Sequence, residues 1–505
     1  MVKKIKDFLF YNTTARQTVA KNTLWLSVSN FGGRIVRSIL VIYAARILGP
    51  TEWGIFNYAI TIAAFLTLFV DAGVNQTMMR ENAKTTDPKH KIGILSTSFF
   101  LKCVLLTAGI FIVLFIAPRI PTAEAVMAEK AAALFPFIAL ILAFDTLRQF
   151  GFSVIDSEEK MQWEAGLFLL TNLSIVGAGF FALTHVGTVV SFTVAYAAGT
   201  GIGMIATFLV LRHYFKGLLT NFTRSLVKPI FFSAWPFAIS GLLGMLMINT
   251  DVVMIGWLLS AENVGLYSAP QRIIQLLYLI PSIISISILP VFARLARNDD
   301  KKMAHMLEYL ISATFLLAFP LAAGGLLLGQ NIISFIFGGG FAAATLSFRI
   351  LLLTLLIDFP AIILSNAIFS YNKQKKLIVY SALGGFSNVF LNILLIPVFG
   401  IAGCALATLI AQCISNIYLW HTMKALNPIA IFPRLKNIAI ATAVMAVTTF
   451  GISLLSIHIL LNIIISACAY FAVLYFLREP VLREIKVMLR QTVSTEQAVY
   501  ESASG

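Results

Sequence analysis

The feature that most constrains this chain is a succession of apolar runs, each long enough to cross the hydrocarbon core of a bilayer. A spanning helix needs about 20 mostly apolar residues, and the runs follow one another with short polar connections between them. We expect spans near residues 22–47, 53–78, 92–117, 131–155, 163–184, 187–211, 229–258, 264–292, 304–327, 341–370, 376–397, 401–422, 436–455 and 459–477, with a break around 338–340.

The composition of the chain supports the same class of fold. Hydrophobic residues make up 59% of the 505 residues and charged residues 12%, with a mean hydropathy of +0.89. A soluble domain carries roughly 25% charged and 45–50% apolar residues, and no single soluble core shelters this much apolar surface. The expected fold class is an all-α integral membrane protein with about fourteen transmembrane helices.

Lysine and arginine alternate between the two ends of the predicted spans. Cytoplasmic loops retain an excess of these residues, so the basic segments are assigned to the inside and both termini to the cytoplasm. The opposite loops hold only Arg46, Arg119 and Lys130. The basic segments are the amino-terminal tail, 80–91, 160, 212–228, 294–302, 373–376, 424–436 and 478–490.

The chain contains an internal repeat of six spans. Residues 48–56 match residues 259–267, and Asn172 and Asn388 stand at equivalent positions. Because six is even, both copies enter the membrane in the same sense, which predicts two lobes related by an axis along the membrane normal. The expected domains are an N-lobe (1–211), an interfacial amphipathic linker (212–228), a C-lobe (229–425), spans 13 and 14 (426–480) and a cytoplasmic tail (481–505).

Signatures of soluble enzymes do not occur in the sequence. There is no Gly-x-x-x-x-Gly-Lys loop for nucleotide phosphates and no His-Glu-x-x-His motif. The four cysteines lie in apolar runs without paired spacing, which is typical of packing residues. The sequence therefore predicts a protein that is not an enzyme, with no cofactor, no metal and no nucleic-acid partner.

At Leu48-Gly-Pro-x-x-Trp-Gly-Ile-Phe56, followed by Asp71-Ala-Gly73, the chain resembles the polysaccharide exporters. These are the O-antigen and capsule flippases of the multidrug/oligosaccharidyl-lipid/polysaccharide superfamily. The turn at Gly400–Gly403 and the fourteen-span layout fit the resemblance. It implies a two-lobed transporter that flips an undecaprenyl-diphosphate-linked oligosaccharide across the bacterial inner membrane. It also implies membrane lipids, a coupling H⁺ or Na⁺ and other polysaccharide-assembly proteins as partners.

Ionisable residues inside the spans are the candidates for function. Each costs roughly 2.5–3.5 kcal/mol at the centre of a helix, so each needs a partner or a watery cavity. Arginine grips a diphosphate with two parallel hydrogen bonds, and cations exceed anions in the spans. The cations are Arg34, Arg37, Lys102, Arg148, Arg272 and Arg349, and the anions are Asp71, Asp145, Asp251 and Asp358.

The predicted substrate-binding residues lie on three spans, the first, the eighth and the tenth. Asn30, Arg34 and Arg37 share one face of the first span. Arg272 and Gln275 share a face of the eighth span. The alternative is an ion pair between helices, for example Arg272 with Asp251. The last predicted substrate-binding residue is Arg349 in the tenth span.

Three acidic residues are candidates for ion coupling or gating. They are Asp71 near the cytoplasmic end of span two, Asp251, and Asp358 in the middle of span ten. Asp358 is the favoured site for a coupling proton or cation. Structural alternatives are an Asp145–Arg148 pair within one helix and a Lys102 side chain that snorkels towards the cytoplasm.

The function predicted from these residues is the flipping of the lipid-linked oligosaccharide by alternating access. The first alternative is a cation-coupled multidrug-type antiporter, which would favour an acidic cavity. The second is a membrane-embedded glycosyl transferase, which would need a larger extramembrane loop than this chain offers.

Overall fold

The computed structural model describes residues 15–455 and 457–480, and these are almost entirely helical, with no strand among them. The predicted cytoplasmic tail, 481–505, lies outside the described residues. Eleven helical segments of the described part are long and apolar enough to cross a membrane, or twelve with one bent pair. The all-helical membrane class is therefore confirmed.

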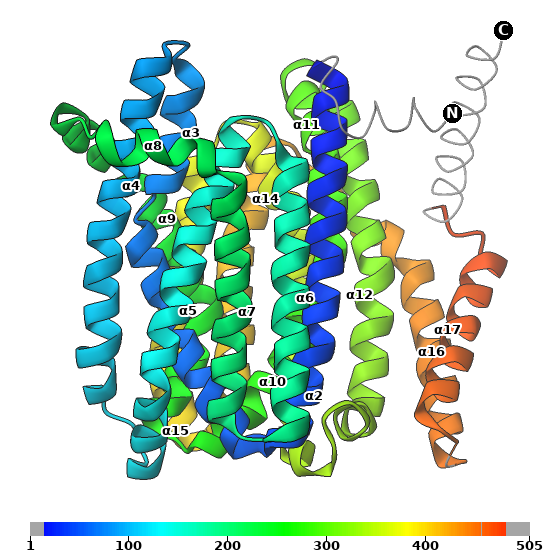
Figure 1. The fold of residues 1–505 in the computed structure, drawn as a ribbon. Helices are drawn as coiled ribbons and strands as arrows, with labels where there is room; N and C mark the ends of the chain where they lie inside the picture. Colours follow the sequence, from blue (N-terminus) through cyan, green and yellow to red (C-terminus); the bar gives the residue numbers. More distant parts are fainter. Residues whose placement is uncertain (1–14, 456, 481–505) are drawn as a thin grey trace, which may run out of the picture. The chain divides into compact units, whose positions relative to one another are not determined.

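Two of these segments each contain a reversal of the chain. The helix α2 (Ala15–Asp71) is interrupted at Gly49, which has a φ of 71° and a ψ of 174°. The helix α15 (Gln374–Leu426) is interrupted at Gly400, with a φ of 58°. Both glycines occupy backbone conformations that L side chains rarely adopt. Each long helix therefore supplies two of the predicted spans, as Figure 1 shows for α2.

The chain divides into two compact units. Unit 1 holds the described residues up to Leu276 together with Phe337–Ala344 and Gly384–Ala407. Its helices are α2, α3 (Val74–Lys84), α4 (Pro88–Phe111), η1 (Ile112–Ile116), η2 (Ala117–Arg119), α5 (Ala125–Ser157), α6 (Met161–His185), α7 (Val189–Val210), α8 (Arg212–Thr220), α9 (Arg224–Leu258), α10 (Ala261–Leu277), η3 (Gly339–Ala344) and the middle of α15.

Unit 2 holds Leu277–Ile336, Thr345–Leu383 and the described residues from Thr408 onward. The two units are defined by packing and do not follow the predicted lobes, so the two-lobe symmetry stays a prediction. The helices of unit 2 are α11 (Leu279–Asn298), α12 (Asp300–Phe337), α13 (Thr345–Leu353), α14 (Leu355–Ser370), both ends of α15, η4 (Phe432–Leu435), α16 (Lys436–Leu454) and α17 (Ile459–Phe476).

The basic loops of unit 1 meet at one end of that unit. The Asn82 amide donates to Ser157 Oγ at 3.0 Å, and Thr97 Oγ1 accepts from the Thr223 backbone N–H at 3.1 Å. Apolar residues from α3, α4, α5, α6 and α8 form one core there. We call this the basic end. In Figure 1, α8 lies across the ends of its neighbours, and α9 begins at Arg224, four residues earlier than the predicted linker ended.

At the other end of unit 1, two glycines that the repeat aligns pack against each other. A Cβ atom on Gly265 of α10 would lie 1.8 Å from the Pro50 carbonyl oxygen, and one on Gly54 of α2 would lie 1.9 Å from the Ala261 carbonyl oxygen. Backbones can approach this closely only where no side chain intervenes. The two glycines thus fix the crossing of α2 and α10.

Unit 2 has its own apolar core, built from α11, α12, α14, α15, α16 and α17. Its last two helices are joined by buried polar side chains: Thr449 Oγ1 donates to Ser466 Oγ at 2.8 Å. Tyr470 of α17 donates to the Leu316 carbonyl of α12 at 2.7 Å.

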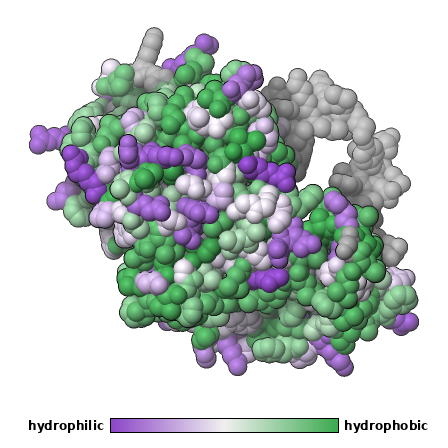
Figure 2. Space-filling model, turned by 90° about the horizontal axis from the view of Figure 1, so that it is seen from below, coloured by the Kyte–Doolittle hydropathy of each residue, from purple (hydrophilic) through white to green (hydrophobic). Residues whose placement is uncertain are grey.

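Large apolar side chains are also exposed along the helices, including Phe181, Leu209 and Val447. Figure 2 looks onto the ends of the helices and shows hydrophilic side chains scattered over that face among hydrophobic ones. Exposed apolar flanks are expected of helices that face lipid.

Candidate functional site: a basic cluster in unit 1

Arg272 on α10 is held by neutral amides. Its Nη2 donates to Asn57 Oδ1 of α2 at 3.2 Å, and its Nη1 donates to Gln275 Oε1 at 3.1 Å. No carboxylate of the described residues forms an ion pair with it. The alternative pairing of Arg272 with Asp251 is therefore wrong, and the guanidinium is positioned without being neutralised.

Arg37 on α2 belongs to the same cluster. Its guanidinium carbon lies 5.1 Å from the centre of the Tyr196 ring on α7, a distance at which a cation is attracted to the ring face. Its Nε is buried without a hydrogen-bond partner among the described residues. Arg37 and Arg272 also repel one another, so two uncompensated cations share this region.

Tyr196 interacts electrostatically with Arg37, Arg272, Arg148 and Asp145, so these five residues belong to one cluster. Arg148 donates to Asp145 at 2.6 Å within α5, which confirms the pair expected from their spacing. One of the three arginines is thus neutralised internally, and the cluster keeps a net positive charge.

Asn30 and Arg34 precede Arg37 on the unbroken first part of α2. The three residues stand at i, i+4 and i+7 of this helix, so they share the predicted face. Arg34 is exposed, and no ion pair of its side chain occurs among the described residues. The structure brings Arg37 and Arg272 together, and Arg34 lies about one helical turn before Arg37 on α2.

Lys102 and Asp71 form a buried ion pair. The Lys102 side chain is 1% exposed, so the expected snorkelling towards the cytoplasm is wrong. Asp71 is the last residue of α2 and is followed by Ala72 and Gly73, both with positive φ. The pair joins this helix end to α4, which gives Asp71 a structural partner.

Asp251 lies in a separate buried network of unit 1. It accepts hydrogen bonds from the Tyr267 hydroxyl and from Asn392 Nδ2 at 2.8 Å. The same Asn392 nitrogen also contacts Asn388 Oδ1 at 3.1 Å. α9, α10 and α15 are therefore linked through one carboxylate.

Asp358 is the centre of a buried network in unit 2. It accepts from the Tyr278 hydroxyl at 2.7 Å, and that hydroxyl lies 2.9 Å from Thr354 Oγ1. Among the described residues, Asp358 forms no ion pair. A buried carboxylate without a cationic partner is costly while it is charged.

Arg349 lies on α13 of unit 2. Its side chain covers Gly329 of α12, where a Cβ atom would lie 3.2 Å from Arg349 Cγ. Its Nε is buried and has no hydrogen-bond partner among the described residues. Within the residues that the structure describes, Arg349 and Asp358 do not form an ion pair.

Several partners were not foreseen from the sequence. Asn57 and Tyr196 belong to the basic cluster, Asn392 to the Asp251 network and Tyr278 to the Asp358 network. Each is a polar residue in an apolar run, which is the one signal that could have singled them out. Among the described residues, no group of three or more His, Cys, Asp and Glu side chains could hold a metal ion.

The helical membrane architecture, with uncompensated arginines among its spans, defines a polytopic protein with a transporter-type fold. The fold is similar to that of a solved structure described as the lipid II flippase MurJ, inward closed conformation: the TM-score is 0.75, the identity 18%, and the match covers 90% of this chain and 99% of that one.

The chain belongs to the polysaccharide biosynthesis protein family, whose model matches residues 19–296. A second model, MatE, matches residues 236–398. The chain is 21% identical to a probable low-salt glycan biosynthesis flippase, Agl15, of Haloferax volcanii, over 86% of this chain and 89% of the relative. It is 22% identical to a putative O-antigen transporter of Shigella flexneri, over 71% of this chain and 86% of the relative.

Proposed function

We propose that this protein flips an undecaprenyl-diphosphate-linked oligosaccharide from the cytoplasmic to the outer leaflet of a bacterial inner membrane. Membership of the polysaccharide biosynthesis family supports the proposal. Relatives named as a glycan flippase and an O-antigen transporter support it as well.

The observation that carries the proposal is that Arg37 and Arg272 belong to one cluster and that neither is neutralised by a carboxylate of the described residues. Two such cations repel each other, and this repulsion is relieved when an anion binds between them. Guanidinium groups match the geometry of diphosphate oxygens. Arg34 and Asn30 extend the same face of α2 and supply further donors.

The proposed mechanism is alternating access. The charged headgroup enters from the inside, the arginines hold its diphosphate, and a movement of the lobes exposes it to the outside. The lipid tail stays in the bilayer throughout. The polar headgroup therefore does not cross the hydrocarbon without hydrogen-bond partners, which would cost a large free energy.

Asp358 is the proposed site of a coupling ion. Its carboxylate is held by a tyrosine hydroxyl and by no ion pair in the described chain, so a proton or Na⁺ would relieve its buried charge. Asp71 is a weaker candidate for this role because Lys102 already neutralises it. Asp251 and Arg349 remain candidates for coupling and substrate contact respectively.

The MatE match to residues 236–398 makes a cation-coupled antiporter of organic cations the second candidate function. Such a substrate would need an anionic site, whereas the cluster of unit 1 is basic. The two candidates therefore predict opposite effects when the arginines are removed.

Purified protein in liposomes tests both functions. A fluorescent undecaprenyl-diphosphate-linked sugar should become accessible at the opposite leaflet, and Arg37→Ala and Arg272→Ala should each slow this step. Arg224→Ala, an exposed arginine at the start of α9, serves as the matched control. Exchange of an organic cation for an ion, without movement of the lipid-linked sugar, would favour the antiporter instead.

A further inference from the structure

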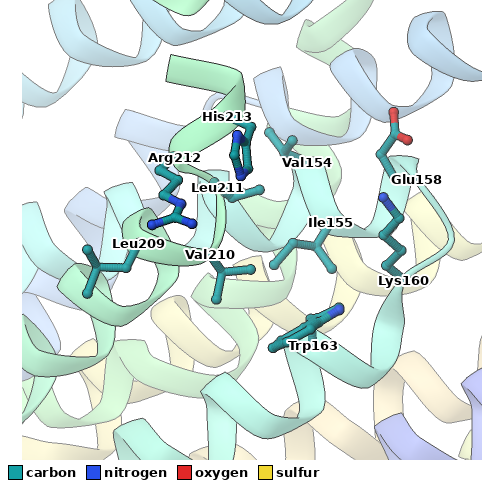
Figure 3. A pocket seen from close by; sticks show the side chains of 10 residues that line it. All are labelled: Val154, Ile155, Glu158, Lys160, Trp163, Leu209, Val210, Leu211, Arg212 and His213. Carbon is teal, nitrogen blue, oxygen red and sulfur yellow. The ribbon is translucent and has the colours of Figure 1, made fainter. Parts of the chain in front are cut away.

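A pocket of about 520 Å³ opens at the basic end of unit 1. It lies where α5 ends, α6 begins and α7 gives way to α8, as Figure 3 shows. No residue of α2 lines this pocket, so Arg34 and Arg37 do not contribute to it. Arg272 of α10 does not line it either. The pocket is therefore separate from the basic cluster.

The rim of this pocket carries charges of both signs. Lys160 and Glu158 stand on one side and Arg212 on the other, with Ile155 and Val210 between them (Figure 3). Both cations are exposed, and neither forms an ion pair among the described residues. Two cations with one carboxylate match a headgroup that contains a phosphate and an ammonium group.

The rest of the lining is suited to an acyl chain. Ile155 and Leu211 are buried and form an apolar floor. Trp163 on the first turn of α6 is 53% exposed, and Leu209 on the last turn of α7 is 65% exposed. Tryptophan at the end of a span sits at headgroup level, so the apolar side of the pocket leads towards the hydrocarbon.

A second pocket of about 310 Å³ shares Glu158 and His213 with the first and adds Lys91. The charged rim therefore continues along α8 towards the start of α4. Basic pockets between transmembrane helices bind the phosphates of lipid headgroups, and the two pockets together offer a continuous rim for the glycerol and phosphate of one lipid.

We infer that this pocket binds one phosphatidylethanolamine molecule: Lys160 and Arg212 hold the phosphate, Glu158 holds the ammonium, and Trp163 and Leu209 flank an acyl chain. Phosphatidylcholine has a quaternary ammonium that cannot donate a hydrogen bond to Glu158. Phosphatidylglycerol has no ammonium, so it leaves the Glu158 carboxylate without a partner beside the bound phosphate. The site should therefore prefer phosphatidylethanolamine to both.

Quenching of Trp163 by lipids with brominated acyl chains tests this site. The protein is placed in nanodiscs of phosphatidylcholine with rising fractions of brominated phosphatidylethanolamine, phosphatidylglycerol or phosphatidylcholine. The Trp163 signal is the difference between the wild type and Trp163→Phe. Half-maximal quenching should require about fivefold less phosphatidylethanolamine than phosphatidylcholine, the factor expected of one surface charge.

The variants separate the roles of the charges. Glu158→Gln should abolish the preference for phosphatidylethanolamine over phosphatidylcholine. Lys160→Ala and Arg212→Ala should each weaken quenching about fivefold. The control pair Lys89→Ala and Arg224→Ala removes one lysine and one arginine that do not line the pocket, and it should leave quenching unchanged.

Three results would overturn the inference. One is equal quenching by the three lipids, or a preference for phosphatidylglycerol. Another is an equal loss in the control pair. The third is saturation of the Trp163 signal by soluble phosphoethanolamine while no lipid is preferred, which would identify a soluble ligand. No step of the test depends on what the protein transports.

Discussion

The arginines among the spans of unit 1 differ in how their charge is compensated. Arg148 is paired with Asp145, Arg272 is held by two neutral amides, and Arg37 rests on an aromatic ring. A paired arginine contributes to folding, whereas an arginine held by neutral groups keeps its charge for a ligand. For this reason we propose Arg37 and Arg272, rather than Arg148, as the residues that bind the diphosphate.

Replacement of Arg37 or Arg34 by alanine should reduce export roughly tenfold to a hundredfold, because hydrogen bonds to charged groups contribute about 1.5–3 kcal/mol. The amount of protein in the membrane should hardly change, since no carboxylate is left unmatched. Arg34→Lys should be partly active because it keeps the charge and loses the two-pronged geometry. Export assays with quantified membrane protein measure both effects. Normal export by both alanine variants, or their failure to accumulate, would remove the two residues from the proposed site.

The buried pair of Lys102 and Asp71 should behave in the opposite way. Asp71→Leu leaves a buried lysine uncompensated and should destabilise the protein by about 3–5 kcal/mol. The double variant Asp71→Leu with Lys102→Met should recover most of this stability, because buried pairs can be replaced by apolar residues at little cost. Thermal unfolding in detergent compares the three proteins. Additive effects of the two changes would show that the pair is not coupled.

At the scale of elements, glycine decides where helices approach most closely. Gly199 of α7 lies against the backbone of Ile175 in α6, where a Cβ atom would be 2.5 Å from Ile175 Cα. Gly54 and Gly265 do the same for α2 and α10. These contacts fix the positions of α2, α7 and α10, which carry Arg37, Tyr196 and Arg272.

Gly265→Ala should therefore disturb the basic cluster through the helix crossing. The new methyl group would lie 1.8 Å from the Pro50 carbonyl oxygen, so the helices must separate at a cost of about 1–3 kcal/mol. Gly177→Ala in α6 is the matched control, because nothing lies within 4 Å of its Cβ position; its stability should stay equal or rise by up to about 1 kcal/mol. Unfolding midpoints and export measure the contrast, and equal behaviour of the two variants would contradict it.

At the scale of the whole molecule, the alternation of basic loops predicts the orientation in the membrane. In unit 1, Asn82 near the end of α3, Ser157 at the end of α5 and Thr223 before α9 lie at one end of the unit. At the opposite end, Glu124 accepts a hydrogen bond from the Ala261 backbone at 3.0 Å. In unit 1, the segments rich in lysine and arginine therefore lie at one end, and the segments with few basic residues lie at the other.

Single cysteines test that orientation in a background in which all four native cysteines are replaced, since Cys468 is exposed. An impermeant thiol reagent should label the predicted outside positions from outside and the predicted inside positions only after the membrane is opened. Labelling of residue 375 from outside would break the fourteen-span arrangement. The outside positions are Glu52, Thr122 and Glu262, and the inside positions are Lys89, Lys160 and Lys375.

The sequence alone determined the class of fold, the approximate limits of the spans and the Asp145–Arg148 pair. Each of these depends on residues close together along the chain: the hydropathy of a run of about 20 residues, or a spacing of three on one helix. The same holds for the reversals at Gly49 and Gly400, which interrupt long apolar runs.

Only the tertiary structure decided which charge is compensated and by what. Arg272 meets Asn57, 215 residues away, and Lys102 meets Asp71 on another helix. Hydropathy and spacing carry no information on which faces of distant helices meet, because that choice depends on close packing and on glycine contacts across the whole unit. For the same reason, the pocket between Lys160 and Arg212 exists only once α5, α6, α7 and α8 are packed together.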